Sequence, residues 1–287
     1  MARRRGRTPR RQCGTMIAHA RLIESDPGFR VRLMALEEAI NARMSLAPTV
    51  PKLRTVKVLV HVVYRSAEEN VSAAQINSQI AALNRDYGAK NVDQSHTPAV
   101  WQGLVGDARI RFRLAGVRRV TTSETSFSTD DQVKALSPPL TPQRLLNLWV
   151  CTLGGGLLGY AQFPGGKPAT DGVVILNTAF GTLGTAAAPF DLGRTATHEV
   201  GHYLNLHHIW GDGGLVCTDS DYVHDTPNQE GPNYHRPTFP HVSCHNGPNG
   251  DMFMNYMDYV DEAAMVMFTA QQRARMHATL AGPRSGL

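Results

Sequence analysis

The chain has 287 residues, enough for one large domain or for two lobes around a cleft, and no apolar run approaches the length of a membrane span. Its formal net charge of +5 comes from an N-terminal tail, because six arginines lie within the first 11 residues while the rest carries 23 basic and 24 acidic side chains. Since no aromatic residues interleave with these arginines, we expect a disordered, solvated tail and no nucleic-acid partner.

The four cysteines, at positions 13, 151, 217 and 244, are too sparse for a dense disulfide framework. The basic start lacks the apolar stretch of a secretory signal, so we expect that a signal has been removed or that export uses another route. Further on, Asp26 and Pro27 are typical of a helix start, and the apolar stripe behind them predicts a helix that ends before Pro48 and Pro51.

Strand and helix patterns then alternate along the chain. Ser72 and Gln75 have the spacing of a capping box and predict a helix between the first two strands. This pattern by itself indicates an α+β or α/β protein. Strands are expected at residues 56–65, 109–114, 145–153 and 172–177.

The most informative stretch is an H-E-x-x-H pattern made by His198, Glu199 and His202, on a helix that we expect to begin near Leu192. Histidines four residues apart project from the same helix face, where two neutral imidazoles can hold one zinc ion. A carboxylate in the position of Glu199 can act as a general base beside the metal.

A third zinc ligand requires the chain to turn after this helix. Asn205 stands where the turn belongs, and Asn tolerates the left-handed conformation that ends helices. His208 is the third ligand that the spacing favours; His207 is the alternative and is otherwise a flanking, partly exposed histidine. Three histidines leave one tetrahedral position open, which is typical of a catalytic zinc site.

Two motifs resemble the pappalysin family of metzincin zinc peptidases, in its bacterial form. From His198 onwards the chain reads H-E-x-G-H-x-L-N-L-x-H-I-W-G-D, and from Met254 to Tyr259 it reads M-N-Y-M-D-Y, like the family's Met-turn. The family usually has Gly where this chain has Asn205. The resemblance covers nearly the whole chain and implies the metzincin fold: an α/β-like upper lobe, with a twisted mixed five-stranded sheet and long helices, and an irregular C-terminal lobe.

This resemblance implies a pro-segment at residues 1–54, an upper subdomain with the zinc helix at 55–205, and a lower subdomain with the Met-turn at 206–287. It implies a secreted, zinc-dependent endopeptidase that is made as a latent zymogen and acts on proteins or peptides. The inhibitor would be its own pro-segment, and we expect a monomer without a membrane span.

The roles of several residues follow from the same resemblance. Zinc would polarise the scissile carbonyl, and Glu199 would take a proton from water and deliver it to the leaving amine. Tyr259 would stabilise the oxyanion, and Met257 would form an apolar floor beneath the histidines without binding the metal. Cys13 would occupy the fourth zinc position in the latent form, and its neighbours Arg10 and Arg11 should favour the thiolate.

The resemblance also pairs Cys217 with Cys244 in a disulfide, which implies an oxidising compartment, whereas Cys151 is interpreted as a buried free thiol. An oxygen-rich loop suits a structural calcium ion, with a solvated acidic turn as the alternative. The calcium candidates are Asp212, Asp219, Asp221, Asp225 and Thr226.

Two substrate contacts are expected. Glu262 matches the position of an acidic residue at the base of the family's pocket for the residue just after the scissile bond, which predicts cleavage N-terminal to Arg or Lys. The alternative is a solvated loop residue beside an apolar pocket. Gly172, Val173 and Val174 are expected on the sheet-edge strand along which extended substrate pairs, unless they form an ordinary strand.

Two other functions fit the same zinc motif. The chain could hydrolyse a non-peptide amide, or it could be a catalytically silent zinc-binding module. The intact Glu199 argues against the silent module, because a site that only binds metal does not need that carboxylate.

Overall fold

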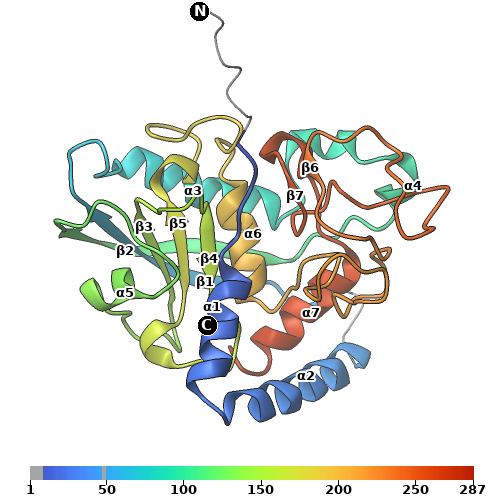
Figure 1. Cartoon of the computed structure of the whole chain (residues 1–287), viewed down its shortest axis with the longest axis horizontal. Coiled ribbons are helices and arrows are strands. Elements are labelled where there is room, and N and C mark those ends of the chain that lie inside the picture. The colour runs from blue at the N-terminus through green and yellow to red at the C-terminus, as the bar shows by residue number, and fades with distance from the viewer. Residues whose placement is uncertain (1–8, 47–49) are drawn as a thin grey trace, which may run out of the picture.

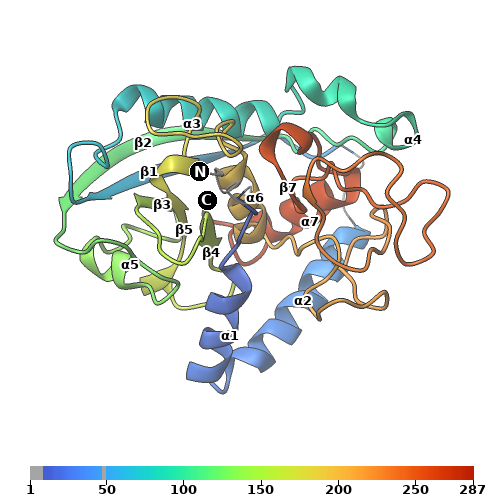
Figure 2. The same ribbon diagram turned by 45° about the horizontal axis from the view of Figure 1, so that its top comes forward.

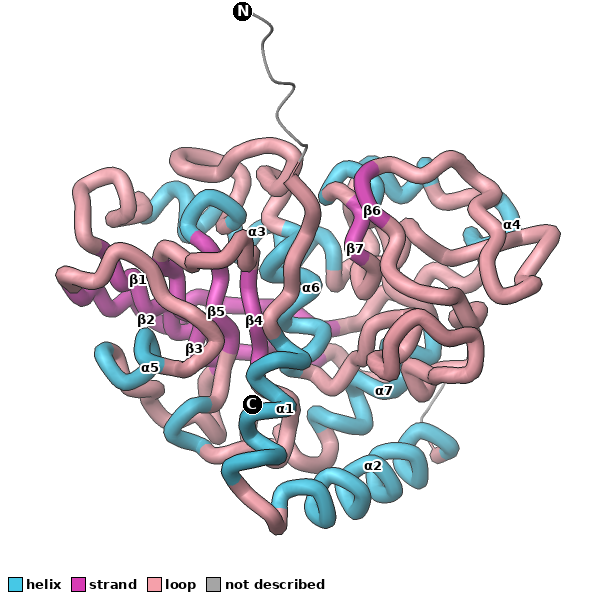
Figure 3. The backbone as a smooth tube through the Cα atoms, viewed as in Figure 1, coloured by secondary structure: helices cyan, strands magenta, loops and turns pink. Residues whose placement is uncertain are grey.

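The computed structural model describes residues 9–46 and 50–287, so most of the arginine-rich tail and Pro48 lie outside the described residues. A five-stranded sheet lies on one side of helix α6 and a loop-rich lobe on the other (Figures 1 and 3). The helices are α1 (Thr15–Ser25), α2 (Phe29–Ser45), α3 (Ala73–Asp86), α4 (Ala99–Gln102), α5 (Gln132–Leu136), α6 (Arg194–Tyr203) and α7 (Ala270–Leu280). The strands are β1 (Arg54–Tyr64), β2 (Ile110–Thr121), β3 (Leu146–Cys151), β4 (Gly159–Ala161), β5 (Val173–Leu176), β6 (Tyr234–His235) and β7 (Tyr259–Val260).

The large sheet has the strand order β2-β1-β3-β5-β4, in which only β4 runs antiparallel to its neighbour. This confirms the mixed five-stranded sheet. The expectation that residues 172–177 form the edge strand is wrong, because β5 pairs with β3 on one side and β4 on the other. The edge strand is β4, which is only three residues long and too short to leave an alternating pattern.

Alternating side chains along the strands fill two cores. Val173 and Ile175 face the layer that contains α3 and α6, whereas Val174 between them faces Ala18 of α1 and Val133 of α5. Both faces of the sheet are therefore covered by helices, as a largely parallel sheet requires. The arrangement holds α6 against β4 and β5, which brings the zinc motif to the edge of the sheet.

The N-terminal segment is the main departure from the expected fold. Residues before α1 run in front of α6, and α2 then lies against α7 (Figures 1 and 2). The expectation of a solvated tail is wrong at its described end, because Arg11 is only 2% exposed and Arg10 stacks on the ring of Tyr234. Helix α1 was not expected from the sequence, since Gly14 at its start offers no capping side chain.

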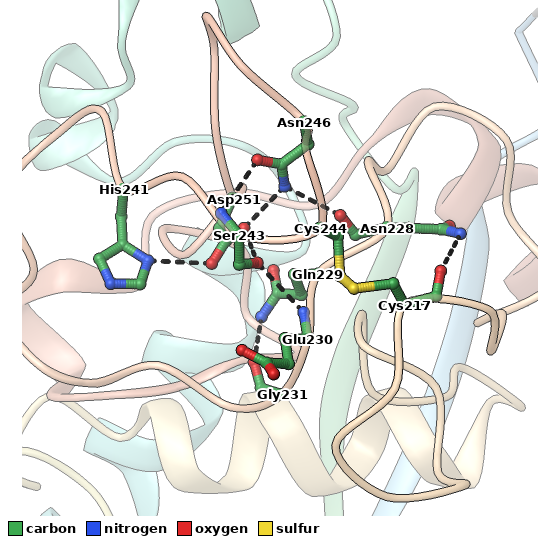
Figure 4. Close-up of a disulfide and its surroundings, with 10 residues drawn as sticks. All are labelled: Cys217, Asn228, Gln229, Glu230, Gly231, His241, Ser243, Cys244, Asn246 and Asp251. Atoms are coloured by element: carbon green, nitrogen blue, oxygen red, sulfur yellow. Dashed lines mark hydrogen bonds and ion pairs between the residues drawn. A yellow bond between two sulfur atoms is a disulfide. The ribbon is translucent and has the colours of Figure 1, made fainter.

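The C-terminal lobe consists mainly of loops, with β6 and β7 as a short ladder (Figure 3). The disulfide Cys217–Cys244 is present and closes 27 residues of this lobe, and Asn228 donates a 3.0 Å hydrogen bond to the Cys217 carbonyl (Figure 4). Cys151 is a buried free thiol, as expected. None of the helices in the described part of the chain is long and apolar enough to cross a membrane.

Candidate metal centre

Helix α6 and the turn after it bring three imidazoles together. Nε2 of His202 lies 3.2 Å from Nε2 of His198 and 3.1 Å from Nε2 of His208. The turn depends on Asn205, whose φ of 72° is left-handed, and on the Leu206 N–H, which donates to the Gly201 carbonyl. The structure therefore brings together the three histidines that the sequence selected.

The other nitrogen of each imidazole has a separate partner. Nδ1 of His198 lies 2.7 Å from the Tyr256 carbonyl oxygen, and Nδ1 of His202 lies 2.8 Å from the Leu206 carbonyl oxygen. A carbonyl can only accept, so both rings donate from Nδ1 and leave Nε2 as a free electron pair. Burial lowers the pKa of both histidines and keeps them neutral.

This arrangement fits a zinc ion. Two zinc–nitrogen bonds of normal length at a tetrahedral angle separate the nitrogens by about 3.3 Å, close to the distances in the histidine cluster. Oriented, neutral imidazoles with acceptors behind them are the usual donors of such sites. In residues 9–46 and 50–287, one group of three or more histidine, cysteine or acidic side chains has its donor atoms within 4.8 Å of each other: Cys13, His198, His202 and His208.

Asp212 orients the third histidine. One carboxylate oxygen lies 2.6 Å from Nδ1 of His208 and the other 3.0 Å from Nδ1 of His207. Burial disfavours the charged form of this carboxylate, but the two imidazoles stabilise that form and hold the pKa of Asp212 well below the usual range. His207 itself stacks on Phe163 outside the cluster, as expected for a flanking histidine.

Cys13 reaches the cluster from the N-terminal segment. Its backbone bridges in parallel to Gly159 of β4, and its Sγ lies 3.4 Å from Oε2 of Glu199. Burial and the Glu199 carboxylate raise the pKa of this thiol. The expectation that its arginine neighbours favour the thiolate is wrong for the described structure: Arg11 attracts a Cys13 thiolate, but burial and Glu199 outweigh that attraction, and Arg10 faces Tyr234 instead.

Glu199 lies fully buried beside the histidines. Burial raises its pKa to about 7, although Thr15, Cys13 and Arg11 act in the opposite direction. Gly159 of β4 permits this close approach, because a Cβ there would lie 2.9 Å from Cγ of Glu199. A carboxyl group that titrates near neutral pH is suited to accept and return a proton.

The Met-turn, residues 254–259, packs against helix α6. A Cβ on Gly201 would lie 2.5 Å from Sδ of Met257, so the thioether packs directly on the zinc helix. The ring of Tyr259 packs edge-on against His208, with centroids 4.9 Å apart. Both residues lie where the Met-turn motif predicted them. Four other methionines of this lobe are buried in the core: Met252, Met254, Met265 and Met267.

Glu262 is buried rather than solvated. One carboxylate oxygen accepts the Leu192 N–H at 2.6 Å and the other accepts the Thr195 hydroxyl at 2.7 Å, so the side chain caps the start of α6. The guanidinium of Arg11 lies 3.8 Å from the same carboxylate, over the ring of Phe190. The Arg11 side chain is therefore buried against the Glu262 carboxylate.

The remaining calcium candidates are dispersed among separate partners. Asp219 accepts backbone N–H groups of Asp212 and Gly213, Asp221 accepts the Thr226 hydroxyl at 2.8 Å, and Asp225 accepts the Thr269 hydroxyl at 2.6 Å. These carboxylates stabilise turns in the described structure, and calcium binding here stays a prediction.

The expected substrate strand also differs from the structure. Gly172, Val173 and Val174 are buried inside the sheet, and the N-terminal segment pairs with β4 instead. Three residues near the centre could not be predicted from the sequence, because their contacts join positions far apart in the chain. These residues are Arg11, Thr15 and Glu37.

Comparisons with known proteins agree with this centre. The family model described as pregnancy-associated plasma protein-A matches residues 141–281. An extracellular metalloprotease of Pyricularia oryzae is 32% identical over 286 residues, covering 96% of this chain and 90% of that protein. An extracellular metalloprotease of Arthroderma otae is 29% identical and covers 81% of this chain and 80% of that protein.

Solved structures extend the agreement to the whole fold. Tannerella forsythia promirolysin, solved as a mutant, has a TM-score of 0.88 and 43% identity, covering 96% of both chains. Mature mirolysin of the same organism, in complex with a cleaved peptide, has a TM-score of 0.78 and 47% identity, covering 79% of this chain and 92% of that chain. These relatives and the three convergent histidines show that the chain belongs to the pappalysin family of metzincins and is a zinc metallopeptidase.

Proposed function

We propose that this chain is an exported endopeptidase made as a latent zymogen, with Glu199 as its general base. The observation that carries the proposal is the position of Cys13: its thiol lies among the three histidines and 3.4 Å from Glu199. A thiol there fills the one position that substrate and water need. Relatives named extracellular metalloproteases support export.

The chemistry then follows from the residues around the metal. Zinc, when bound, supplies Lewis acidity to a carbonyl oxygen and to water. Glu199 accepts a proton from water and returns it to the leaving amine, a role supported by its place 3.4 Å from the Cys13 thiol that lies among the histidines. Tyr259, packed on His208, would donate a hydrogen bond to the developing oxyanion.

We assign latency to residues 1–54, the upper subdomain to 55–205 and the lower subdomain to 206–287. Promirolysin covers 96% of this chain and mature mirolysin 79%, which supports an N-terminal segment that is removed. Cys13 and the three histidines all come from this chain, so the centre is complete without a second copy, and we propose a monomer. We also propose that the acidic loop binds a structural calcium ion. If it does, adding calcium to the calcium-depleted protein should raise the melting temperature of the protein.

We further propose cleavage N-terminal to Arg and Lys. Arg11 supports this specificity, because its guanidinium contacts Glu262, donates a 3.2 Å hydrogen bond to the Thr195 hydroxyl and stacks on Phe190. A substrate arginine would find the same partners once Arg11 has left. The capping contacts of Glu262 offer a purely structural alternative.

Glu262→Gln separates these two roles, because glutamine keeps an acceptor for the helix start and removes the charge. The test is to sequence the new N-termini after digestion of a proteome. Wild-type protein should give N-termini that begin with Arg or Lys, and the variant should lose this preference by about tenfold or more. A profile led by Leu or Phe, or one unaltered in the variant, would remove the acidic pocket from the proposal.

The endopeptidase activity is tested with the processed protein on casein. Cleavage should stop on zinc chelation and return when zinc is restored. Cleavage of small amides without casein would favour the non-peptide hydrolase, and zinc binding without hydrolysis of either would favour a silent binding module.

A further inference from the structure

Glu37 of α2 is bound by two residues next to the zinc helix. Its Oε1 accepts the Asn205 side-chain amide at 2.8 Å, and its two oxygens lie 2.9 and 2.7 Å from Nη2 of Arg275. Arg275 is fully buried, and its Nε donates to the Asn205 carbonyl at 2.6 Å. Asn205 and Arg275 therefore form a preformed receptor for one carboxylate.

This receptor belongs to the catalytic domain, whereas Glu37 belongs to the proposed pro-segment. Departure of α2 would leave the Arg275 guanidinium without its carboxylate and open that end of the side chain to another anion. Nη1 of Arg275 lacks a hydrogen-bond partner within the described residues. Asp221 is close enough to interact with Arg275, but its oxygens already accept the Val223 N–H and the Thr226 hydroxyl.

A cavity of about 350 Å³ lies beside the receptor, between α2 and the catalytic domain. On the catalytic side it is lined by Phe163, Asn205, His207 and Tyr222. The ring of Tyr222 also lies 5.1 Å from the Arg275 guanidinium. Loss of α2 would thus uncover an aromatic surface next to the carboxylate receptor, a combination that suits a peptide side chain.

The receptor and the Glu262 pocket lie at opposite ends of the zinc helix. Glu262 bonds to Leu192 and Thr195 at the start of α6, and Asn205 follows the end of α6 at Tyr203. Ten helical residues span about 15 Å, which an extended peptide covers in roughly four or five residues. The N-terminal segment passes along this helix between the two ends (Figure 1).

We propose that the mature enzyme binds an acidic side chain of its substrate at Asn205 and Arg275, about four or five residues before the Arg or Lys held at Glu262. This proposal rests on the endopeptidase function and on the Glu262 pocket. The direction follows because the zinc-binding histidines of α6 lie between the two ends, and the basic residue follows the scissile bond.

The test uses processed enzyme and peptides with one fixed Lys at the cleavage position and Glu or Gln at each preceding position in turn. At one position about four or five residues before the Lys, kcat/KM should favour Glu over Gln by about tenfold. Asn205→Gly keeps the left-handed turn and should reduce that ratio. Asn205→Asp also tolerates the turn, and because its carboxylate would pair with Arg275 and repel an acidic peptide side chain, it should abolish the preference for Glu.

The ratio of Glu to Gln peptide within each variant is the readout, so a change in overall activity does not affect it. Binding of the same peptides to the processed Glu199→Gln protein, measured by fluorescence anisotropy, gives the ratio without catalysis. Equal kcat/KM and equal affinity for the Glu and Gln peptides at every position would overturn the proposal. The contact of Glu37 with Asn205 and Arg275 would then only hold the pro-segment in place. Failure of the proposed function would differ, because no peptide would then be cleaved whatever the binding ratio.

Discussion

The hydroxyl of Thr15 donates a 2.8 Å hydrogen bond to Oε2 of Glu199. The same oxygen of Thr15 accepts the backbone N–H of Ala161 on the edge strand β4, also at 2.8 Å. One buried side chain therefore engages the proposed general base and a backbone donor of the sheet edge. Together with Cys13 at the metal centre, Thr15 covers both the Glu199 carboxylate and the edge strand β4, along which we propose that a substrate pairs.

Thr15→Val should weaken latency, because it removes both hydrogen bonds while keeping the shape of the side chain. Each buried bond contributes about 1 kcal/mol, so loss of both, about 2 kcal/mol, should accelerate activation about thirtyfold. The measurement is the time course of activity when full-length protein is mixed with a trace of processed enzyme. Thr15→Ser, which keeps the hydroxyl, is the matched control and should activate at nearly the wild-type rate.

Cys13→Ala should also accelerate self-activation, because alanine cannot bind the metal. The full-length variant should hydrolyse a small peptide before any chain is cut, which separates loss of the thiol from loss of the pro-segment. An activation time course like that of the wild type would contradict a cysteine switch.

The pro-segment should be cut in front of Lys52. Lys52 is exposed before β1, whereas Arg43 lies inside α2 and the Arg54 N–H already pairs with the Arg109 carbonyl. An extended, exposed backbone enters a protease cleft without unfolding, and a helix does not. Mass spectrometry of the mature protein should find Lys52 at its N-terminus. Lys52→Gln should slow this cleavage, and Arg43→Gln should leave it unchanged.

Acid should destabilise the protein partly through His61. Burial lowers the pKa of this side chain to about 4, from about 6.5 in the unfolded chain. The unfolded state therefore binds more protons, and stability present above pH 6.5 is lost as the pH falls towards 4. The contribution is about 3 kcal/mol. His61→Gln should flatten the fall in melting temperature over this range relative to the wild type.

Loss of the disulfide should destabilise the C-terminal lobe. Closing 27 residues restricts the unfolded chain by about 3.5 kcal/mol in the chain-entropy account. The double substitution of Cys217 and Cys244 by serine should lower the melting temperature by several degrees. Cys151→Ala, which removes a thiol outside that lobe, serves as the control, and an equal loss in both proteins would argue against a specific role for the bridge.

The parts that sequence predicted best were those set by local patterns. The zinc motif, the Asn205 turn and the Met-turn each lie within a few residues, and β1 and β3 have strong apolar runs. The disulfide came from the family resemblance. By contrast, β4 is too short to carry a pattern, and its Gly159 is explained only by the approach of Glu199.

Contacts between distant segments could not be predicted. From its neighbours in the sequence, Arg11 is expected to belong to a solvated basic tail. Nothing near it indicates a contact with Glu262, which lies 251 residues further along the chain. Glu37 shows no local sign of its contact with Asn205 for the same reason. Asp212 read as a calcium ligand, since the sequence does not reveal that His207 and His208 both turn an imidazole nitrogen towards it.

The most direct test of the central claim compares processed wild-type protein with Glu199→Gln. Zinc content is measured by mass spectrometry and cleavage by release of casein peptides from the same samples. One zinc ion is expected in both proteins, with cleavage about a thousandfold slower in the variant, because only the general base is lost. Cleavage by the variant at the wild-type rate, or a zinc-loaded wild type that cuts nothing, would contradict a peptidase that depends on Glu199.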